Sequence, residues 1–310
     1  MRVVFMGSAP LSCPSLEALA GADGIEVVAA ITQPDRPKGR RLSVSESPVK
    51  ALASSLGIAV QTPENVNAAP SVAAIAGPAP DVIAVAAYGQ ILKPCVLDLP
   101  RLGCVNVHAS LLPRYRGAAP IQWAIANGEG ITGVTIMFMA EGMDTGDIIT
   151  QAEVEIGDTE TGGELHDRLG TVGARTLVEA LQLFQAGDVP RRAQDAAEAT
   201  YAPKLKKSDG EIDWTSPARD VYNRVRAFNP WPCCRCRIKG HNLRVLAVRV
   251  EDGDGEPGTV LEVSGDGPVV AAGEGSVRLV EVQPEGKRPM GGAAYLSGHG
   301  LEVGEVLDST

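Results

Sequence analysis

Short apolar runs alternate with helix signals over the first 187 residues of this chain. The run from Asp81 to Ala87, "DVIAVAA", is nearly continuous in apolar residues, and the runs "RVVFM" and "EVVAAI" precede it. Apolar side chains at successive positions indicate a strand that is buried on both faces. Helix signals lie between these runs, such as Ser47 as an N-cap followed by Pro48 in the first turn. The alternation predicts an α/β fold in which helices cover both sides of a parallel sheet.

The sequence changes character after a long amphipathic segment that ends at Gly187. The following segment has little apolar periodicity, and we interpret residues 190–208 as a linker. Strand-like pieces separated by Gly, Asp and Pro then follow at short intervals, which predicts a small β-barrel over 209–310. With 310 residues, the chain is long enough for two cores, because single cores rarely extend beyond about 250 to 300 residues. We therefore expect one domain at 1–189 and a second at 209–310.

Neither a membrane span nor a metal site is indicated by the sequence. The first apolar run, "VVFM", is too short for a signal peptide or a membrane span, so we expect a cytoplasmic protein. The cluster "CCRC", with Cys233, Cys234 and Cys236, has no second group of Cys and His near it in sequence. A tetrahedral site needs four ligands, so we interpret these residues as reduced thiols on a strand.

Positive charge gathers in two places on a chain whose net charge is −10. Thr200 to Val250 contains eleven Lys or Arg against four Asp or Glu, and Gln33 to Ser47 is a long loop with four basic residues. Loops of about two to six residues are usual in α/β units. A locally basic surface attracts phosphates even on an acidic protein. From charge alone, an ordinary solvated face is the better interpretation of Thr200 to Val250, whereas for Gln33 to Ser47 a binding arm and a plain surface loop are even.

Polar side chains interrupt the strand "CVNVH" at its carboxyl end. Asn106 and His108 are two residues apart and therefore point to the same face of the strand. Ligands of parallel sheets bind beyond the carboxyl ends of the strands. A Gly-rich loop after the strand "GVTIMFM" supplies Asp144 and Asp147, and this strand end could adjoin the first. Taken alone, the Asn and His could also be structural groups that cap a strand end.

An amide, an imidazole and a carboxylate at neighbouring strand ends would suit acyl transfer. The amide of Asn106 can donate to a developing oxyanion, and His108 can handle a proton. Asp144 would orient the imidazole. The chain lacks the GxSxG, GxGxxG and GxxxxGK[ST] motifs, which argues against a nucleophile elbow, a dinucleotide site and a P-loop. We therefore expect direct transfer between two substrates, held in position by the enzyme.

The segment "NVHASLLPRYRGAAPIQWAI" resembles the signature of the folate-dependent formyltransferases. The segments "TQPDRPKGRR", "AYGQIL", "GVTIMFMAEGMDTGDI", "RAFNPWP" and "QPEGKRPM" match the tRNA-acting branch of that family, in order and over nearly the whole chain. The resemblance implies a Rossmann-like parallel-sheet formyltransferase domain followed by a small OB-like β-barrel domain that helps to hold tRNA. It implies transfer of formyl from 10-formyltetrahydrofolate to the α-amino group of methionyl initiator tRNA, without a metal. A monomer is the default expectation.

The resemblance also assigns roles to individual residues. The catalytic set would be Asn106, His108 and Asp144. The folate would be lined by Tyr88, Gly89, Gln90, Ile91, Ser110, Leu111, Leu112 and Pro113. The tRNA would be contacted from the basic loop and the linker by Arg36, Lys38, Arg40, Arg41, Lys204, Lys206 and Lys207, with Arg40 sensing the acceptor stem.

Three alternatives share parts of this pattern. A sugar-nucleotide N-formyltransferase would carry out the same chemistry on another amine, but the basic loop and linker favour tRNA. An inert tRNA- or folate-binding module would not need the complete set of Asn106, His108 and Asp144. A folate-hydrolysing relative would use the same set and would lack the barrel.

Overall fold

The computed structural model describes residues 1–38 and 43–308, and the chain folds into two compact units. The first unit comprises Met1–Pro120, Ile131–Glu155 and His166–Ala202. The second comprises Ile121–Gly130, Ile156–Leu165 and Pro203–Thr310. The domain limits expected at residues 189 and 209 stay a prediction.

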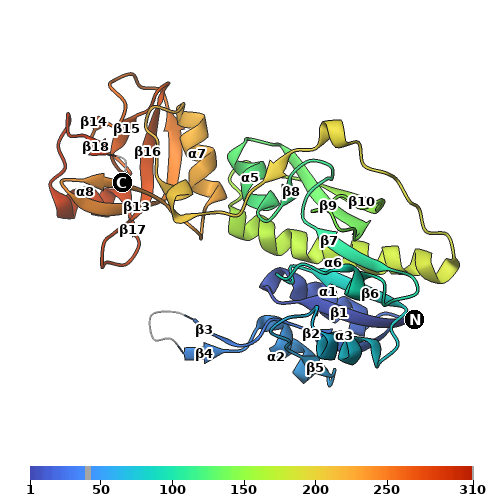
Figure 1. Cartoon of the computed structure of the whole chain (residues 1–310). Coiled ribbons are helices and arrows are strands. Elements are labelled where there is room, and N and C mark those ends of the chain that lie inside the picture. The colour runs from blue at the N-terminus through green and yellow to red at the C-terminus, as the bar shows by residue number, and fades with distance from the viewer. Residues whose placement is uncertain (39–42, 309–310) are drawn as a thin grey trace. The chain divides into compact units, whose positions relative to one another are not determined.

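A seven-stranded sheet forms the centre of the first unit (Figure 1). In spatial order its strands are β10 (Ile148–Glu155), β9 (Ile131–Phe138), β7 (Cys104–His108), β6 (Val82–Ala86), β1 (Arg2–Gly7), β2 (Glu26–Ile31) and β5 (Val60–Gln61). The five strands from β7 to β5 are parallel. The strand order reverses between β1 and β6, so the topological switch point lies at the carboxyl ends of these two strands. Open α/β sheets bind ligands at such a point.

Helices and short turns connect these strands. They are η1 (Pro10–Ser12), α1 (Cys13–Ala20), α2 (Pro48–Ser55), α3 (Ala69–Ala76), α4 (Pro94–Leu97), α5 (Pro120–Ala126), α6 (Gly162–Ala186) and η2 (Ala196–Glu198). The expected N-cap of α2 is confirmed, because the side chain of Ser47 accepts a hydrogen bond from the backbone N–H of Lys50 at 3.0 Å.

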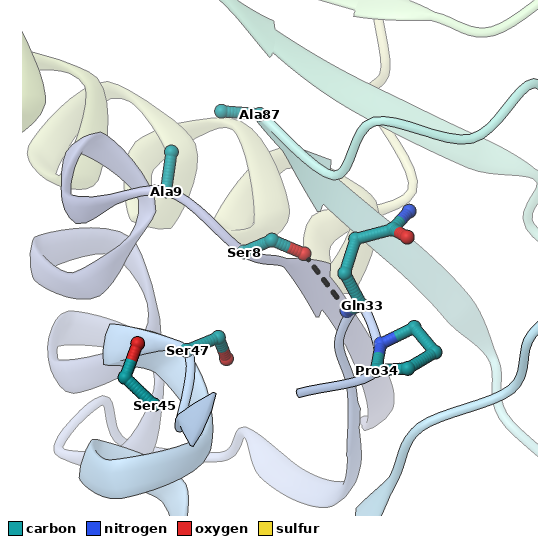
Figure 2. Close-up of a pocket in the computed structure, with 7 residues that line it drawn as sticks. All are labelled: Ser8, Ala9, Gln33, Pro34, Ser45, Ser47 and Ala87. Atoms are coloured by element: carbon teal, nitrogen blue, oxygen red, sulfur yellow. Dashed lines mark hydrogen bonds between the residues drawn. The ribbon is translucent and has the colours of Figure 1, made fainter. Parts of the chain in front are cut away.

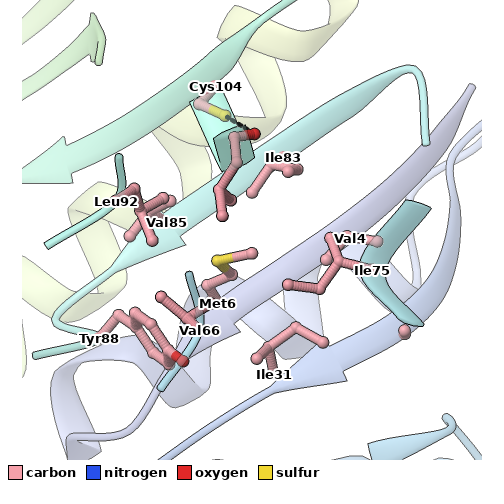
Figure 3. Packing of buried hydrophobic residues seen from close by; sticks show 12 residues of the cluster. Val4, Met6, Ile31, Val66, Ile75, Ile83, Val85, Tyr88, Leu92 and Cys104 are labelled. Atoms are coloured by element: carbon pink, nitrogen blue, oxygen red, sulfur yellow. Dashed lines mark hydrogen bonds between the residues drawn. The ribbon is translucent and has the colours of Figure 1, made fainter. Parts of the chain in front are cut away.

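Both faces of the sheet are buried, as the apolar runs predicted. On one face Met6 and Val85 pack in a cluster with Ile75 of α3 (Figure 3). On the other face Val3 and Phe5 are also fully buried. Alternate residues of one strand thus serve two separate cores, which explains why β1 and β6 carry almost no polar residues.

One strand of this otherwise parallel sheet runs in the opposite direction. β9 is antiparallel to both of its neighbours, and its residue Thr135 pairs with His108 while Phe138 pairs with Val105. The connection after His108 does not return the chain to the opposite edge of the sheet. β9 therefore begins beside the carboxyl end of β7 and runs back alongside that strand. An apolar run indicates that a strand is buried. It does not show whether that strand runs parallel or antiparallel to its neighbours.

Two small ribbons accompany this sheet. β3 (Arg36–Lys38) and β4 (Ser43–Ser45) form an antiparallel pair within the long loop after β2. β8 (Arg116–Gly117) pairs in parallel with β11 (Tyr201–Ala202). Residues 201–202 are therefore hydrogen-bonded to residues 116–117, which lie in the loop after β7.

The second unit contains an antiparallel sheet that closes on itself. Its strands are, in spatial order, β14 (Val260–Glu262), β15 (Val269–Ala271), β16 (Ser276–Pro284), β13 (His241–Glu251), β12 (Cys234–Ile238) and β18 (Leu307–Asp308), and β17 (Met290–Gly291) pairs with β16. The N–H of Val260 donates to the carbonyl of Glu305 at 2.8 Å, and Thr259 bridges to Val306. These bonds join β14 to the segment before β18 and complete the expected barrel. Its helical elements are η3 (Lys207–Gly210), α7 (Ala218–Ala227) and α8 (Gly292–His299).

The "CCRC" cluster lies at the start of the barrel, where Cys234 and Cys236 belong to β12. Together with Cys233 they are buried free thiols, as expected. Burial raises the pKa of Cys234 to about 12, so this thiol stays protonated. In the described part of the chain, no helix combines the length and apolar character that crossing a membrane requires.

Candidate active site

His108, the last residue of β7, is buried with 6% of its surface exposed. Its Nε2 lies 2.9 Å from the carbonyl oxygen of Tyr115. Because a carbonyl oxygen can only accept, Nε2 carries the hydrogen and donates it. Nδ1 is then the ring atom at which the imidazole can take up or release a proton.

The carboxylate of Asp144 faces this second nitrogen. Its Oδ2 lies 3.7 Å from His108 Nδ1, within ion-pair distance but too far for a hydrogen bond. The same oxygen accepts a hydrogen bond from the backbone N–H of Gly117 at 2.8 Å. Gly117 has a φ of 120°, and a Cβ there would lie 2.5 Å from the carbonyl oxygen of Ala202, so the amide that holds the carboxylate requires glycine.

The route by which Asp144 reaches the imidazole differs from the expected one. We expected the end of the strand before Asp144 to adjoin the end of β7. Because β9 is antiparallel, its carboxyl end at Phe138 lies beside Val105, at the start of β7. The loop between Phe138 and Ile148 instead carries Asp144 back to His108.

Asn106 supplies an amide on the same face of β7 as His108, because side chains alternate along a strand. It is partly exposed, unlike most residues of this strand. Within residues 1–38 and 43–308 its side chain has no hydrogen-bond partner. Its N–H groups are therefore available to a ligand oxygen beside an imidazole–carboxylate pair.

A cavity of about 340 Å³ opens at the carboxyl ends of β1, β2 and β6 (Figure 2). Its lining residues are Ser8, Ala9, Gln33, Pro34, Ser45, Ser47 and Ala87. The backbone N–H of Gln33 donates to the hydroxyl of Ser8 at 3.0 Å, and this hydroxyl donates to the carbonyl of Tyr88 at 3.1 Å. The cavity thus lies at the switch point of the sheet, on the edge where β7 also ends.

Comparison with protein families assigns both halves of the chain. Residues 1–181 match the model described as formyl transferase, and residues 204–300 match the model of the formyl transferase C-terminal domain. The chain belongs to the formyl transferase family.

Full-length relatives agree with this assignment. A protein of Geobacter sulfurreducens named methionyl-tRNA formyltransferase is 46% identical over 307 residues, which cover 99% of this chain and 96% of the relative. A protein of the same name from Acetivibrio thermocellus is 47% identical over 310 residues, which cover 99% of each chain. A solved structure of an N-formyltransferase from Helicobacter canadensis, in complex with folinic acid and dTDP-3-aminofucose, superposes with a TM-score of 0.67 at 17% identity, covering 92% of this chain and 99% of that one. That likeness shows the fold.

The residues predicted to line folate in this formyl transferase differ greatly in exposure. They follow the ends of β6 and β7, which are adjacent strands, so both segments lie at one edge of the sheet. Ile91 is 81% exposed, Gly89 is also exposed, and Leu111 and Pro113 are partly exposed. These four positions can meet a ligand.

The other four predicted residues have structural contacts. The Ser110 hydroxyl donates to the carbonyl of Arg114, and Leu112 packs in a small core cluster. The side-chain amide of Gln90 bonds the backbone of residues 63 and 66. Tyr88 is 2% exposed, and burial raises the pKa of its hydroxyl to about 12. Their side chains therefore stabilise the two segments through internal contacts.

The predicted tRNA contacts are only partly described. Arg40 and Arg41 lie outside the described residues, and Arg36 and Lys38 belong to β3, whose backbone pairs with β4. In the linker, Lys204, Lys206 and Lys207 are exposed. At the base of the basic loop, Lys50 lies 2.5 Å from the carboxylate of Asp35 and 3.6 Å from that of Glu46. One lysine is therefore paired with both loop acids.

The groups that hold the pair in place were not predicted from the sequence. The carbonyl of Tyr115 fixes His108 and the amide of Gly117 fixes Asp144. Both are backbone atoms, which have no signature in a sequence. Among the described residues, no group of three or more His, Cys, Asp or Glu is arranged to hold a metal ion.

Proposed function

We propose that this protein transfers the formyl group of 10-formyltetrahydrofolate to the α-amino group of methionyl initiator tRNA. The observation that carries the proposal is the Asn106, His108 and Asp144 arrangement in a chain that matches proteins named methionyl-tRNA formyltransferase over 99% of its length. The proposal places the reaction in the cytoplasm, with folate as formyl donor and tRNA as partner.

In the proposed reaction the neutral α-amino nitrogen attacks the formyl carbon directly. Free α-amino groups titrate near about 8, so no strong base is needed to supply the neutral amine. A carbon–nitrogen bond to methionine forms, and the carbonyl oxygen becomes an oxyanion. The free amide of Asn106 donates to that oxygen, and a protonated His108 Nδ1 can add a second donor.

Collapse of the intermediate breaks the bond between the formyl carbon and N10 of the folate. The attacking nitrogen loses one proton and N10 gains one, so the reaction needs no external acid or base. His108 Nδ1 is the ring atom that can carry this proton, and Asp144 stabilises the imidazolium while it does so.

We further propose that the exposed positions at Gly89, Ile91, Leu111 and Pro113 contact the folate. The tRNA would be contacted by the basic loop, with Arg36, Lys38, Arg40 and Arg41, and by Lys204, Lys206 and Lys207. The N-terminal catalytic and C-terminal tRNA-binding parts would correspond to the predicted domains at 1–189 and 209–310.

The test is a single-turnover assay with formyl-labelled 10-formyltetrahydrofolate and one acceptor at a time. We expect label on methionyl initiator tRNA, little label on a dTDP-amino sugar, and little release of formate without an acceptor. Asp144→Asn is the control that should abolish most of the transfer. Labelling of the amino sugar in preference to tRNA would contradict the proposal and support the sugar-nucleotide alternative.

A further inference from the structure

Residues 192–202 follow α6 and precede the C-terminal part of the second unit. This segment holds both His108 and Asp144, which we call the catalytic pair. One side chain of this segment bonds the Asp144 loop, and another bonds the residue that orients His108. The segment was expected to be a linker, and most of its side chains are exposed. Gln194 is an exception, because it is partly buried between exposed neighbours.

Gln194 uses its whole amide in these contacts. Its Nε2 donates to the carbonyl oxygens of Asp144 and Gly146, both at 2.8 Å. Its Oε1 accepts from Arg116 Nε at 3.1 Å and Nη2 at 2.7 Å. An amide has two N–H donors and two acceptor positions, so this side chain is saturated.

The backbone that Gln194 holds needs support. Asp144 has a φ of 52°, in the left-handed region that a non-glycine residue adopts only at a cost. Arg116, which fixes the other end of the Gln194 amide, is 5% exposed. A buried guanidinium and a saturated amide thus determine where the Asp144 backbone lies, and hence where its carboxylate meets His108.

Thr200 acts on the other member of the pair. Its hydroxyl accepts a hydrogen bond from the N–H of Tyr115 at 2.8 Å, and its carbonyl accepts from the N–H of Arg116 at 2.9 Å. The carbonyl of Tyr115 in turn accepts from His108. Tyr115 has a φ of 60°, so this turn is also held in the left-handed region.

We propose that Gln194 and Thr200 are positioning residues for the formyl-transfer site, Gln194 acting through Asp144 and Thr200 through Tyr115 and His108. The kinetic test of this inference rests on the proposed function. A second test, the exchange of the Gly117 amide proton, does not depend on activity. Displacing a reacting group by about 1 Å can cost on the order of 100-fold in rate. The two residues touch neither substrate in this scheme, so their loss should change turnover more than substrate binding.

The decisive variant is Gln194→Glu, which keeps the shape and the bond from Arg116 but replaces two N–H donors with a carboxylate oxygen. We expect kcat to fall about 10- to 100-fold with KM for both substrates within about twofold. In an Asp144→Asn background the same substitution should change kcat less than about twofold, because groups that act as one unit are not additive. The matched control is Gln185→Glu on α6, where Nε2 also donates to a backbone carbonyl, that of Gly24. It should behave like the wild type.

Exchange of the Gly117 amide proton gives a readout that does not depend on activity, because this N–H donates to Asp144. Hydrogen exchange followed by NMR should show Gly117 exchanging about tenfold faster in Gln194→Glu and in Asp144→Asn, and at the wild-type rate in Gln185→Glu. Unchanged Gly117 exchange in Gln194→Glu, or a full rate loss that persists in the Asp144→Asn background, overturns the proposal. An inactive wild type with the expected exchange pattern contradicts only the proposed function.

Thr200 provides a second pair of variants if Gln194→Glu does not fold. Thr200→Val removes the acceptor at nearly constant volume, and Thr200→Ser restores it. We expect kcat to fall about tenfold in Thr200→Val and to recover in Thr200→Ser. Equal activity of these two variants overturns the role of Thr200.

Discussion

At the scale of single residues, the side chain of Asn106 offers the sharpest test of the chemistry. Its amide has no partner among the described residues and lies on the His108 face of β7. We expect Asn106→Ala to lose roughly 2 to 4 kcal/mol of transition-state stabilisation, about 30- to 900-fold in kcat. Asn106→Asp should lose at least as much, because an anion would face the oxyanion. Urea midpoints near the wild-type value would exclude a folding defect, and near-normal turnover of the alanine variant would show that another group donates.

The three residues that we propose to react can be recognised in the sequence, because each has a side chain of suitable chemistry near a strand end or in a Gly-rich loop. It did not reveal what holds them. The carbonyl of Tyr115 and the amide of Gly117 are present in every peptide bond, and only the fold selects these two. Gln194 was hidden for a related reason, because a single glutamine in an aperiodic segment carries no pattern.

At the scale of elements, the β13–β16 pair contains a charge cluster that links barrel stability to pH. Arg249 and Arg278 lie directly opposite each other, an arrangement that is unfavourable by itself. Glu251 accepts from Arg278 Nε at 2.7 Å and Nη2 at 2.9 Å, and also from Arg249. The bonds from Arg278 lower the pKa of Glu251 below its ordinary value of 4.5. A lowered folded-state pKa means stability that is present above about pH 4.5 and is lost as the pH falls through the folded value.

We therefore predict that Arg278→Met destabilises the second unit by about 1 to 3 kcal/mol near neutral pH. The difference from the wild type should shrink as the pH falls below 4.5, because protonated Glu251 no longer gains from the arginine. Thermal unfolding between pH 7 and pH 3 measures this convergence. Arg244→Met, at an exposed position of the same strand β13, is the control and should show a constant small difference. A pH-independent gap for Arg278→Met would mean that packing, and not the ion pair, is responsible.

Elements were predicted well wherever local chemistry determines them. The apolar runs marked β1, β2, β6 and β7, and Ser47 marked the start of α2. The direction of β9 was not predictable, because an apolar strand buried on both faces reads the same in either direction. That direction depends on the connection after His108, whose path is a property of the whole sheet.

At the scale of the molecule, the change of sequence character near Gly187 predicted two parts but not their composition. Ile121–Gly130 and Ile156–Leu165 belong to the second unit although they lie within the range 1–189 predicted for the first domain. Their partners are distant in sequence: Trp123 stacks edge-on against Phe228, with ring centroids 5.8 Å apart, and Arg226 Nη1 donates to the carbonyl of Gly157 at 3.0 Å. Such long-range contacts leave no trace in a local window.

The uneven charge of the chain gives the last prediction. The net charge is −10, which disfavours nonspecific attraction to tRNA. In the proposed function, the exposed lysines near the start of the second unit's C-terminal part would therefore act locally. Replacing Lys204, Lys206 and Lys207 by alanine should weaken tRNA binding at low salt. It should also make the plot of log affinity against log salt shallower, by up to about 0.9 for each phosphate that is no longer neutralised.

Binding titrations between about 50 and 300 mM salt measure both the affinity and this slope, because counterion release dominates in this range. Arg175→Ala on α6, at an exposed position paired with Glu179, is the control and should leave the slope unchanged. An unchanged slope in the triple variant would mean that these lysines do not meet the phosphate backbone, and that affinity comes from the basic loop or the barrel.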